Sequence, residues 1–162
     1  TTRVGGSVSA RVRGDFFDGT ANVALVNARF DDTGLGVPYV PDFVLRNEAA
    51  LFHDLFEVEQ SPVRGRLGLG VSAVSPRALP YGQTSEPTVD LDAGVAATWR
   101  FLELNVEARN LANLENRSAE YVYPSHFDRD SAPSLVPARH FSAAPPLGVF
   151  ATLSANIGGE LR

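Results

Sequence analysis

The sequence predicts an all-β fold made of long antiparallel strands, and three observations predict it. Residues 63–74 (VRGRLGLGVSAV) alternate apolar residues with polar or small ones at a period of two, the period of a β-strand. Residues 89–99 (VDLDAGVAATW) repeat that alternation. Helical periodicity is almost absent, and no window approaches the run of about eighteen apolar residues that a membrane-spanning helix needs.

The length of these strands and the position of their charges narrow the fold class. Each strand has about ten residues, the length with which a tilted strand crosses a bilayer. The charged residues of each strand lie on one side only. A transmembrane β-barrel requires this pattern because lipid covers its outer face and water fills its interior. We therefore expect an antiparallel transmembrane β-barrel.

Seven strands are predicted, at residues 3–13, 20–31, 43–53, 63–74, 89–99, 102–111 and 149–157. The first and third strands each have one apolar face. The second has apolar residues on both faces, with Ala24 and Val26 on one and Val23 and Leu25 on the other, so its facing stays open. The fourth and fifth strands are the two alternating stretches described above.

The C-terminal part of the chain adds a hairpin and an open question. Only Arg100 and Phe101 separate the fifth and sixth strands, which predicts a tight antiparallel hairpin. A long segment at residues 113–140 precedes the last strand. Within it, residues 118–127 are the best place for an eighth strand, since Ala119, Tyr121 and Tyr123 share one face.

Short and long connections alternate along the chain. The short ones are at residues 14–19, 54–62 and 100–101, and the long ones are at 32–42, 75–87 and 113–140. Outer-membrane barrels have this asymmetry, with short periplasmic turns and long extracellular loops. Aromatic residues gather at the short set, which predicts a girdle at the periplasmic interface, whereas in a soluble sandwich they would be core residues. The predicted girdle consists of Phe16, Phe17, Phe52, Phe56, Trp99 and Phe101.

The alternation also predicts which side chains face lipid and which face the lumen. The expected outward residues are Val63, Leu67, Leu69, Val71, Val89, Leu91, Val95, Leu104, Val106, Leu153 and Ile157. The expected lumen-facing residues are Arg64, Arg66, Asp90, Asp92, Glu103, Glu107 and Arg109.

Composition and motifs exclude several kinds of site. The net charge of −5 and the dispersed arginines argue against nucleic acid as a partner, and zero cysteine excludes disulfides and thiolate metal sites. No nucleophile, phosphate-loop or dinucleotide motif occurs, so we expect no enzyme activity, no cofactor and no bound metal. In the longest loop, His126, Asp128 and Asp130 are possible contacts for a metal-bearing ligand, although a solvated polar loop is the simpler interpretation.

Residues 90–157 resemble the C-terminal end of the TonB-dependent outer-membrane receptors. A strand that ends in Trp99 leads through a tight turn to a strand with the pair Asn110-Leu111, followed by Asn113. Then come Tyr121, a long loop, the Arg-aromatic stretch 139–141, Pro145 and a closing strand. Upstream, GLGVPYVPDFVLRNEAALF at residues 34–52 resembles the family's Gly-x-x-Val-Pro-x-x-Pro loop and the strand after it.

The resemblance implies a location and a function. It implies that residues 1–162 are the C-terminal part of a 22-stranded barrel in the outer membrane of a Gram-negative bacterium, without a plug domain. The implied function is uptake of a scarce ligand, such as a metal chelate, a cobalamin-like compound or an oligosaccharide. The implied partners are outer-membrane lipid, the remaining barrel wall and plug on another segment or chain, and TonB through that plug. The family's chains end on an aromatic residue, whereas residues 158–162 here are Gly-Gly-Glu-Leu-Arg.

Two other hypotheses remain open from the sequence. One is a small self-standing eight-stranded barrel, or a degenerate receptor remnant, that serves as an anchor or as a subunit of an outer-membrane complex. The other is a soluble lipocalin-like or sandwich binding protein.

Overall fold

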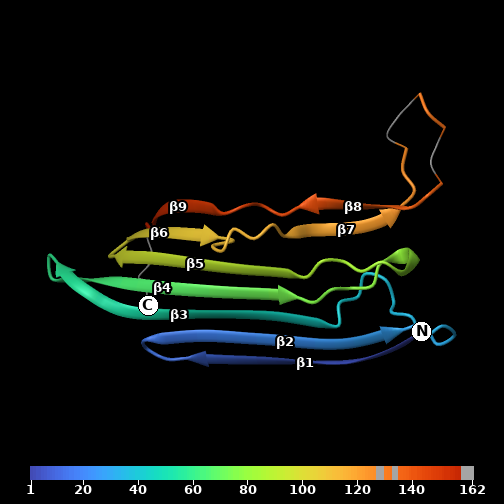
Figure 1. Ribbon diagram of the computed structural model, residues 1–162. Helices are drawn as coiled ribbons and strands as arrows, with labels where there is room; N and C mark the ends of the chain where they lie inside the picture. Colours follow the sequence, from blue (N-terminus) through green and yellow to red (C-terminus); the bar gives the residue numbers. More distant parts are fainter. Residues whose placement is uncertain (127–129, 133–134, 158–162) are drawn as a thin grey trace.

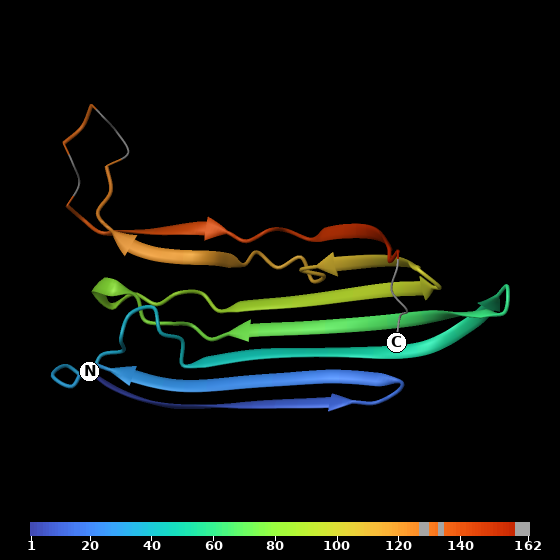
Figure 2. The same ribbon diagram turned by 180° about the vertical axis from the view of Figure 1, so that it is seen from behind.

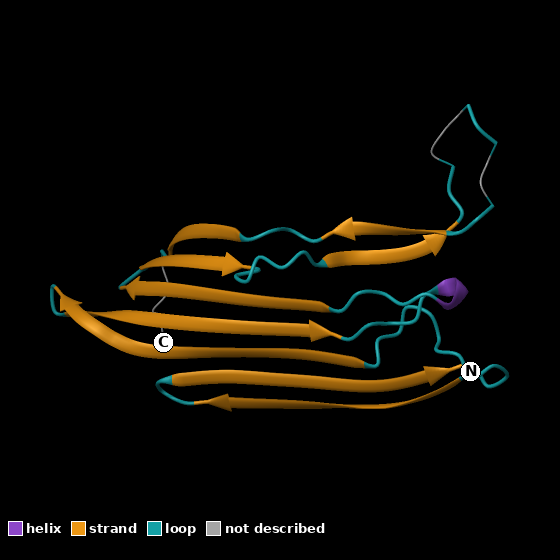
Figure 3. Ribbon diagram, viewed as in Figure 1, coloured by secondary structure: helices purple, strands orange, loops and turns teal. Residues whose placement is uncertain are grey.

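The chain forms one layer of long antiparallel strands in the computed structural model, which describes residues 1–126, 130–132 and 135–157 (Figure 1). The strands of the main sheet are β1 (Thr2–Arg13), β2 (Phe17–Arg29), β3 (Phe43–Val58), β4 (Ser61–Val74), β5 (Thr88–Trp99), β6 (Leu102–Arg109) and β9 (Gly148–Ala155). Two further strands, β7 (Arg117–Tyr123) and β8 (Ala138–Ala143), pair only with each other among the described residues. The single helical segment described is a one-turn 3₁₀ helix, η1 (Pro80–Gly82), drawn purple in Figure 3.

The sheet order is β1-β2-β3-β4-β5-β6-β9, and every neighbouring pair is antiparallel. The prediction of an all-β antiparallel fold is confirmed. In the described part of the chain the sheet does not close, because β1 pairs with β2 alone and β9 with β6 alone. None of the described helices has the length and apolar character needed to cross a membrane.

The strand at residues 117–123 does not add an eighth line to the sheet. Both views show β7 continuing the line of β6 and β8 continuing the line of β9 (Figures 1 and 2). The chain leaves the β6 ladder after Arg109, forms β7 from Arg117 in the same direction as β6, and returns through β8 and β9. Counting β6 with β7, and β8 with β9, as one strand line each, the described chain forms seven strand lines. The two outermost, β1 and β8–β9, are open edges.

Short and long connections lie at opposite ends of the strands, as the sequence predicted. The turns at residues 14–16, 59–60 and 100–101 are at one end, which we call the turn end (Figure 1). The connections at 30–42 and 75–87, together with residues 124–126 and 135–137, are at the other, which we call the loop end. Two of these connections are joined by a backbone hydrogen bond, in which the Tyr39 N–H donates to the Ala78 carbonyl at 2.8 Å.

The third strand and its turn differ from the prediction. β3 continues to Val58, past a bulge between Asp54 and Phe56, and only Glu59 and Gln60 form the turn that was expected at 54–62. Both turn residues have positive φ, 49° and 61°. Such turns usually contain Asn and Gly, and neither stands here, so the sequence carried no turn signal.

The register decides the facing of the second strand. Val23 pairs with Val8 on one side and with Leu45 on the other, so Val23 and Leu25 belong to the apolar face. Ala24 pairs with Ser7 and therefore belongs to the opposite face. Alternation alone did not decide this, because both sets are apolar, whereas hydrogen bonding to two neighbours leaves one register.

The β3–β4 turn generates a stability prediction. Replacing Glu59 with Asn and Gln60 with Gly in the folded protein is expected to stabilise it by about 1 kcal/mol, because left-handed φ is strained for Glu and Gln. The exposed ion pair from Glu59 to Arg100, at 3.0 Å, is lost at little cost. Urea unfolding measures the change, and Glu57→Asn, inside the strand, is the control that should not stabilise.

Candidate functional site

The two faces of the sheet differ in chemistry across all its strands. One register row runs through Val8, Val23, Leu45, Ala73 and Val89. Another row, three residues further along β1 and on the opposite face, runs through Arg11, Thr20, Glu48, Gly70 and Asp92. We call the two sides the apolar face and the polar face.

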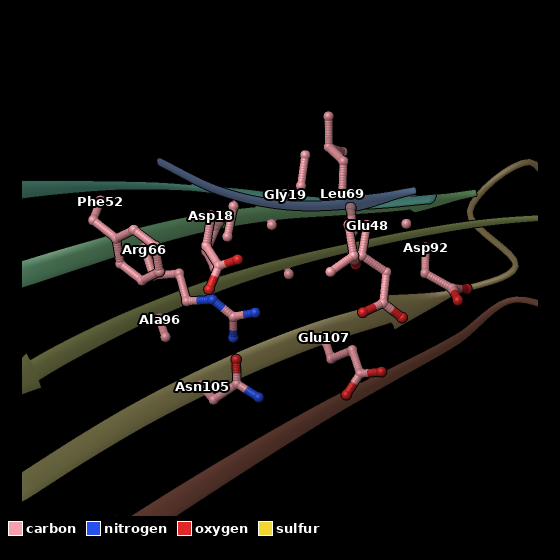
Figure 4. Close-up of a pocket in the computed structure, with 18 of the residues that line it drawn as sticks. Asp18, Gly19, Glu48, Phe52, Arg66, Leu69, Asp92, Ala96, Asn105 and Glu107 are labelled. Atoms are coloured by element: carbon pink, nitrogen blue, oxygen red, sulfur yellow. The ribbon is translucent and has the colours of Figure 1, made fainter. Parts of the chain in front are cut away.

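A trough of about 570 Å³ occupies the middle of the polar face. Small residues form its floor, namely Ala50, Gly68, Gly70, Gly94 and Ala96. Figure 4 shows Glu48, Arg66, Asp92 and Glu107 on one side of the sheet and Leu69 pointing to the other. Longer side chains surround a smooth floor, so a solute can approach the backbone of β4 and β5 closely.

Ion pairs neutralise much of the charge around the trough. Arg11 and Arg13 on β1 both contact the carboxylate of Asp18 on β2, at 3.0 and 3.2 Å. On β3 the Arg46 Nε donates to Glu48 at 3.0 Å, and on β6 the Arg109 Nε donates to Glu107 at 2.8 Å. Each pair is partly exposed, so its main consequence is a hydrated, mixed-charge surface rather than stability.

The charges that line the trough and the smaller cavity beside it are segregated between strands. Strands β1 to β4 contribute Arg11, Arg13, Arg46, Arg64 and Arg66 with two carboxylates, Asp18 and Glu48. Strands β5 and β6 contribute three carboxylates and no cation, namely Asp92, Glu103 and Glu107. The lining is therefore richer in arginine on β1 to β4 and consists of carboxylates on β5 and β6, where Arg109, outside the lining, pairs with Glu107.

The sequence predictions for this face can be compared with the register. All seven predicted polar residues fall on the polar face: Arg64, Arg66, Asp90, Asp92, Glu103, Glu107 and Arg109. Ten of the predicted outward residues fall on the apolar face, and Ile157 lies beyond β9. Which solvent each face meets is a separate matter that the register does not address.

Two of the predicted polar residues have structural partners. Asp90 accepts a hydrogen bond from the Asn116 amide at 2.8 Å, and Asp92 accepts one from the Asn110 backbone N–H at 3.0 Å. Both carboxylates thus hold the segment that follows β6.

Two of the three loop residues considered for a ligand belong to the part of the chain that the structure describes. His126 and Asp130 are exposed at the loop end, and Asp128 lies outside the described residues. Across the described residues, no group of three or more His, Cys, Asp or Glu side chains is placed to hold a metal ion.

The apolar face is uncovered over its whole width. Val8 on β1 is 71% exposed, Leu69 on β4 is 53% exposed and Leu153 on β9 is 72% exposed. Apolar residues this exposed on an edge strand, a central strand and the opposite edge form a continuous patch. A patch of that size on a folded protein marks contact with another molecule or with lipid.

Aromatic residues stand at both ends of the strands. Of the predicted girdle, Phe16, Phe56 and Phe101 are exposed at the turn end, and Trp99 donates its indole N–H to the Val58 carbonyl at 3.3 Å. The other two are near the same end but on opposite faces: Phe17 pairs with Leu51 on the apolar face, whereas Phe52 pairs with Arg66 on the polar face and lines the trough, so its assignment to the girdle was wrong. The loop end has a second set that sequence reasoning did not identify, consisting of Tyr39, Tyr121, Tyr123 and Phe141. Tyr39 and Tyr121 are in contact, with ring centroids 5.9 Å apart.

Between β6 and β7, asparagine side chains take the place of missing ladder bonds. The Asn116 carboxamide donates to the Val89 carbonyl at 2.6 Å and accepts from the Val89 N–H at 3.3 Å. The Asn110 carboxamide makes the same two-way pair with the backbone of Leu114, at 2.9 Å in both directions. Both asparagines are buried, at 8% and 5% exposure. They satisfy a backbone that would otherwise be unpaired.

A buried carboxylate ties the loop end together. Glu120 on β7 is 2% exposed and accepts from the Glu86 N–H at 2.8 Å and from Arg117 at 2.9 Å. Arg139 on β8 lies 3.6 Å from it and also donates to the Thr84 carbonyl. The β4–β5 connection and the last hairpin are thereby joined. Sequence reasoning missed Glu120, because only the tertiary structure shows that Arg117 and Arg139 converge on it.

Comparison of the chain with protein-family models, with curated proteins and with solved structures found no match in any of the three. The functional argument therefore rests on the residues and geometry described above.

The buried carboxylate generates a second stability prediction. Glu120→Ala is expected to destabilise the folded protein by about 3 kcal/mol, because it leaves Arg117, Arg139 and the Glu86 N–H without their buried acceptor. Glu115→Ala, at an exposed position nearby, should change stability by less than about 0.5 kcal/mol. Urea unfolding measures both, and equal effects would contradict the assigned role of Glu120.

Proposed function

We propose that this sheet is part of the wall of an outer-membrane β-barrel of the TonB-dependent receptor type. In this proposal the apolar face contacts lipid, the polar face with its trough lines the aqueous interior, and the loop end is extracellular. The protein takes up a scarce ligand, such as a metal chelate, a cobalamin-like compound or an oligosaccharide. It acts with the rest of the wall, with a plug and, through the plug, with TonB.

The observation that carries the proposal is a single layer with one continuous exposed apolar face and with aromatic residues at both ends of its strands. A barrel wall needs aromatic rings at both membrane interfaces, because they prefer the headgroup level. A soluble sandwich needs a second layer over the apolar face, and the described residues form one layer.

Strand length and loop asymmetry support the same proposal. Strands β1 to β5 have 12 to 16 residues each, more than the nine to eleven that cross the hydrocarbon core at a tilt of about 45°. All three short turns lie at the end opposite the three long connections. The hydrated, mixed-charge trough also favours passage of a ligand over catalysis. Most of the charged groups around the trough are already paired with one another.

The alternative of a self-standing eight-stranded barrel or an anchoring remnant has less support. It needs an eighth wall strand, and the strand found at Arg117–Tyr123 extends the line of β6.

Arginine substitutions on the two faces test the membrane assignment. Leu69→Arg or Val95→Arg, at the middle of the apolar face, is expected to lower the free energy of unfolding in lipid vesicles by about 2–4 kcal/mol. The cause is that the charge must enter hydrocarbon. Ser72→Arg, on the polar face of the same strand as Leu69, should be mild. Equal costs on the two faces would refute the assignment.

Expression of residues 1–162 alone tests the need for a larger wall. The chain is expected to aggregate in detergent or to require a partner, because both edge strands leave backbone groups unpaired. Electrophoresis with and without heating, together with light scattering, measures the outcome. A monodisperse, heat-modifiable monomer would contradict this prediction and favour the self-standing barrel.

A further inference from the structure

The arginines that line the trough and the smaller cavity beside it differ in what holds them. Three of the five are paired with carboxylates, as described above. A fourth, Arg64, donates to the Asp15 carbonyl at 2.9 Å and lies over the Phe52 ring, with its Cζ 5.4 Å from the ring centroid. The fifth, Arg66, has neither a hydrogen bond nor an ion pair to any described residue, and it attracts Glu107 only from farther away. Within the described lining, Arg66 is therefore the arginine whose donors are available.

The Arg66 guanidinium lies over a part of the floor that has no side chain larger than a methyl group. Ala50 on β3, Gly68 on β4 and Gly94 on β5 are register partners and stand side by side across three strands. A methyl group on Gly68 would lie 3.8 Å from the Arg66 Nη2 atom, so the guanidinium is folded back toward this row. Because adjacent strands are about 4.8 Å apart, the row is about 10 Å wide. A flat group can therefore lie on the backbone beside the guanidinium.

Phe52 gives this part of the polar face an apolar wall. It pairs with Arg66 across β3 and β4, and both residues line the trough as well as the smaller cavity. Figure 4 shows the Phe52 ring and the Arg66 side chain on the same side of the sheet. The described residues form one layer, so no second layer packs on this ring. An aromatic ring in that position can instead pack against the apolar part of a bound solute.

The carboxylates on the neighbouring strands restrict the charge of such a solute. An arginine holds one carboxylate through two parallel hydrogen bonds, which are stronger than those to a neutral acceptor. Asp92, Glu103 and Glu107 on β5 and β6 line the same two cavities and repel any further negative charge. The lining therefore favours a solute with one negative charge over a polyanion.

We infer that Arg66, Phe52 and the row of Ala50, Gly68 and Gly94 form a binding subsite for an organic monocarboxylate with a flat apolar part. The carboxylate accepts two hydrogen bonds from Arg66, and the apolar part lies on the row and against Phe52. This inference rests on the proposed function, because a solute passes the trough only where the polar face lines an aqueous interior. It restricts the transported ligand to compounds that carry such a carboxylate.

Fluorine NMR with para-fluorobenzoate as the probe tests this inference. The full-length protein is purified in detergent, and the bound signal is the part that unlabelled benzoate displaces. The comparison probes are para-fluorobenzyl alcohol, which lacks the charge, para-fluorobenzylamine, which reverses it, and fluorophthalate, which doubles it. Para-fluorobenzoate is expected to bind, and each comparison probe is expected to bind at least about tenfold more weakly.

Four variants assign the binding to the subsite. Arg66→Gln is expected to raise the Kd for para-fluorobenzoate at least about tenfold, because it removes charge-assisted hydrogen bonds. Arg66→Lys keeps the charge but loses the planar fork, so its effect should be smaller. Gly68→Val leaves Arg66 in place and should weaken binding by filling the row. Arg3→Gln, at an exposed arginine on the polar face outside the trough, is the matched control and should leave the Kd unchanged.

Three results would each overturn the inference: no displaceable binding by the native protein, equal binding of the benzoate and the benzylamine, or an unchanged Kd in Arg66→Gln. These measurements do not depend on a bilayer, so their failure leaves the membrane assignment in place. Equal costs of Leu69→Arg and Ser72→Arg in lipid vesicles would refute the membrane assignment without affecting the binding of the probe. The two failures are thus distinguishable.

Discussion

The structure depends on one constraint, which is that the backbone of each strand must find hydrogen-bond partners in its neighbours. The described residues form a single layer, so no second layer and no helix shields the sheet. Few apolar residues are buried, and Leu79 and Val122 among them lie at the loop end. Cohesion therefore comes from the ladders, and the apolar side chains contribute only when a surrounding medium covers them.

The loop end shows how the constraint is met where the ladder is interrupted. After β6 the chain leaves its neighbour for several residues. The Asn116 carboxamide supplies the bonds to Val89 that a strand would have made, and the Asn110 carboxamide closes the turn onto Leu114. Asn110 also has a φ of 51°, which asparagine tolerates better than most residues. Glu120 then joins the second half of this strand line to the β4–β5 connection. Polar groups thus hold together the part of the sheet that hydrophobic contact cannot.

The need of each strand backbone for hydrogen-bond partners also restricts what can surround the sheet. Open edges and an exposed apolar face are unfavourable in water, since they promote aggregation. In the barrel wall that we propose, both would become contacts, the edges with further strands and the face with lipid. The polar face, with its paired charges and small-residue floor, would then line the hydrated interior.

The sequence by itself determined most of the strands of the main sheet and, except for the second strand, their faces. Alternation with period two is a local property, so the strands containing Leu69, Val95 and Leu104 could be recognised without any knowledge of their neighbours. The alternation of short and long connections could also be read from the chain, because glycine, proline and polar residues mark the interruptions. The resemblance to the receptor family singled out Asn110 and Asn113. No local sequence pattern, however, indicates which backbone hydrogen bonds an asparagine side chain replaces.

Only the tertiary structure decided the features that depend on pairing. The facing of Val23 and the extension of β3 to Val58 follow from the register with neighbouring strands, and register is a relation between distant segments. Residues 117–123 have the alternation of a wall strand, yet their place at the end of β6 is set by the break at Asn110 and by pairing with β8. The burial of Glu120 between Arg117 and Arg139 likewise exists only once these strands are side by side. Local periodicity encodes which face a side chain occupies, whereas hydrogen bonding between strands decides which neighbours it meets.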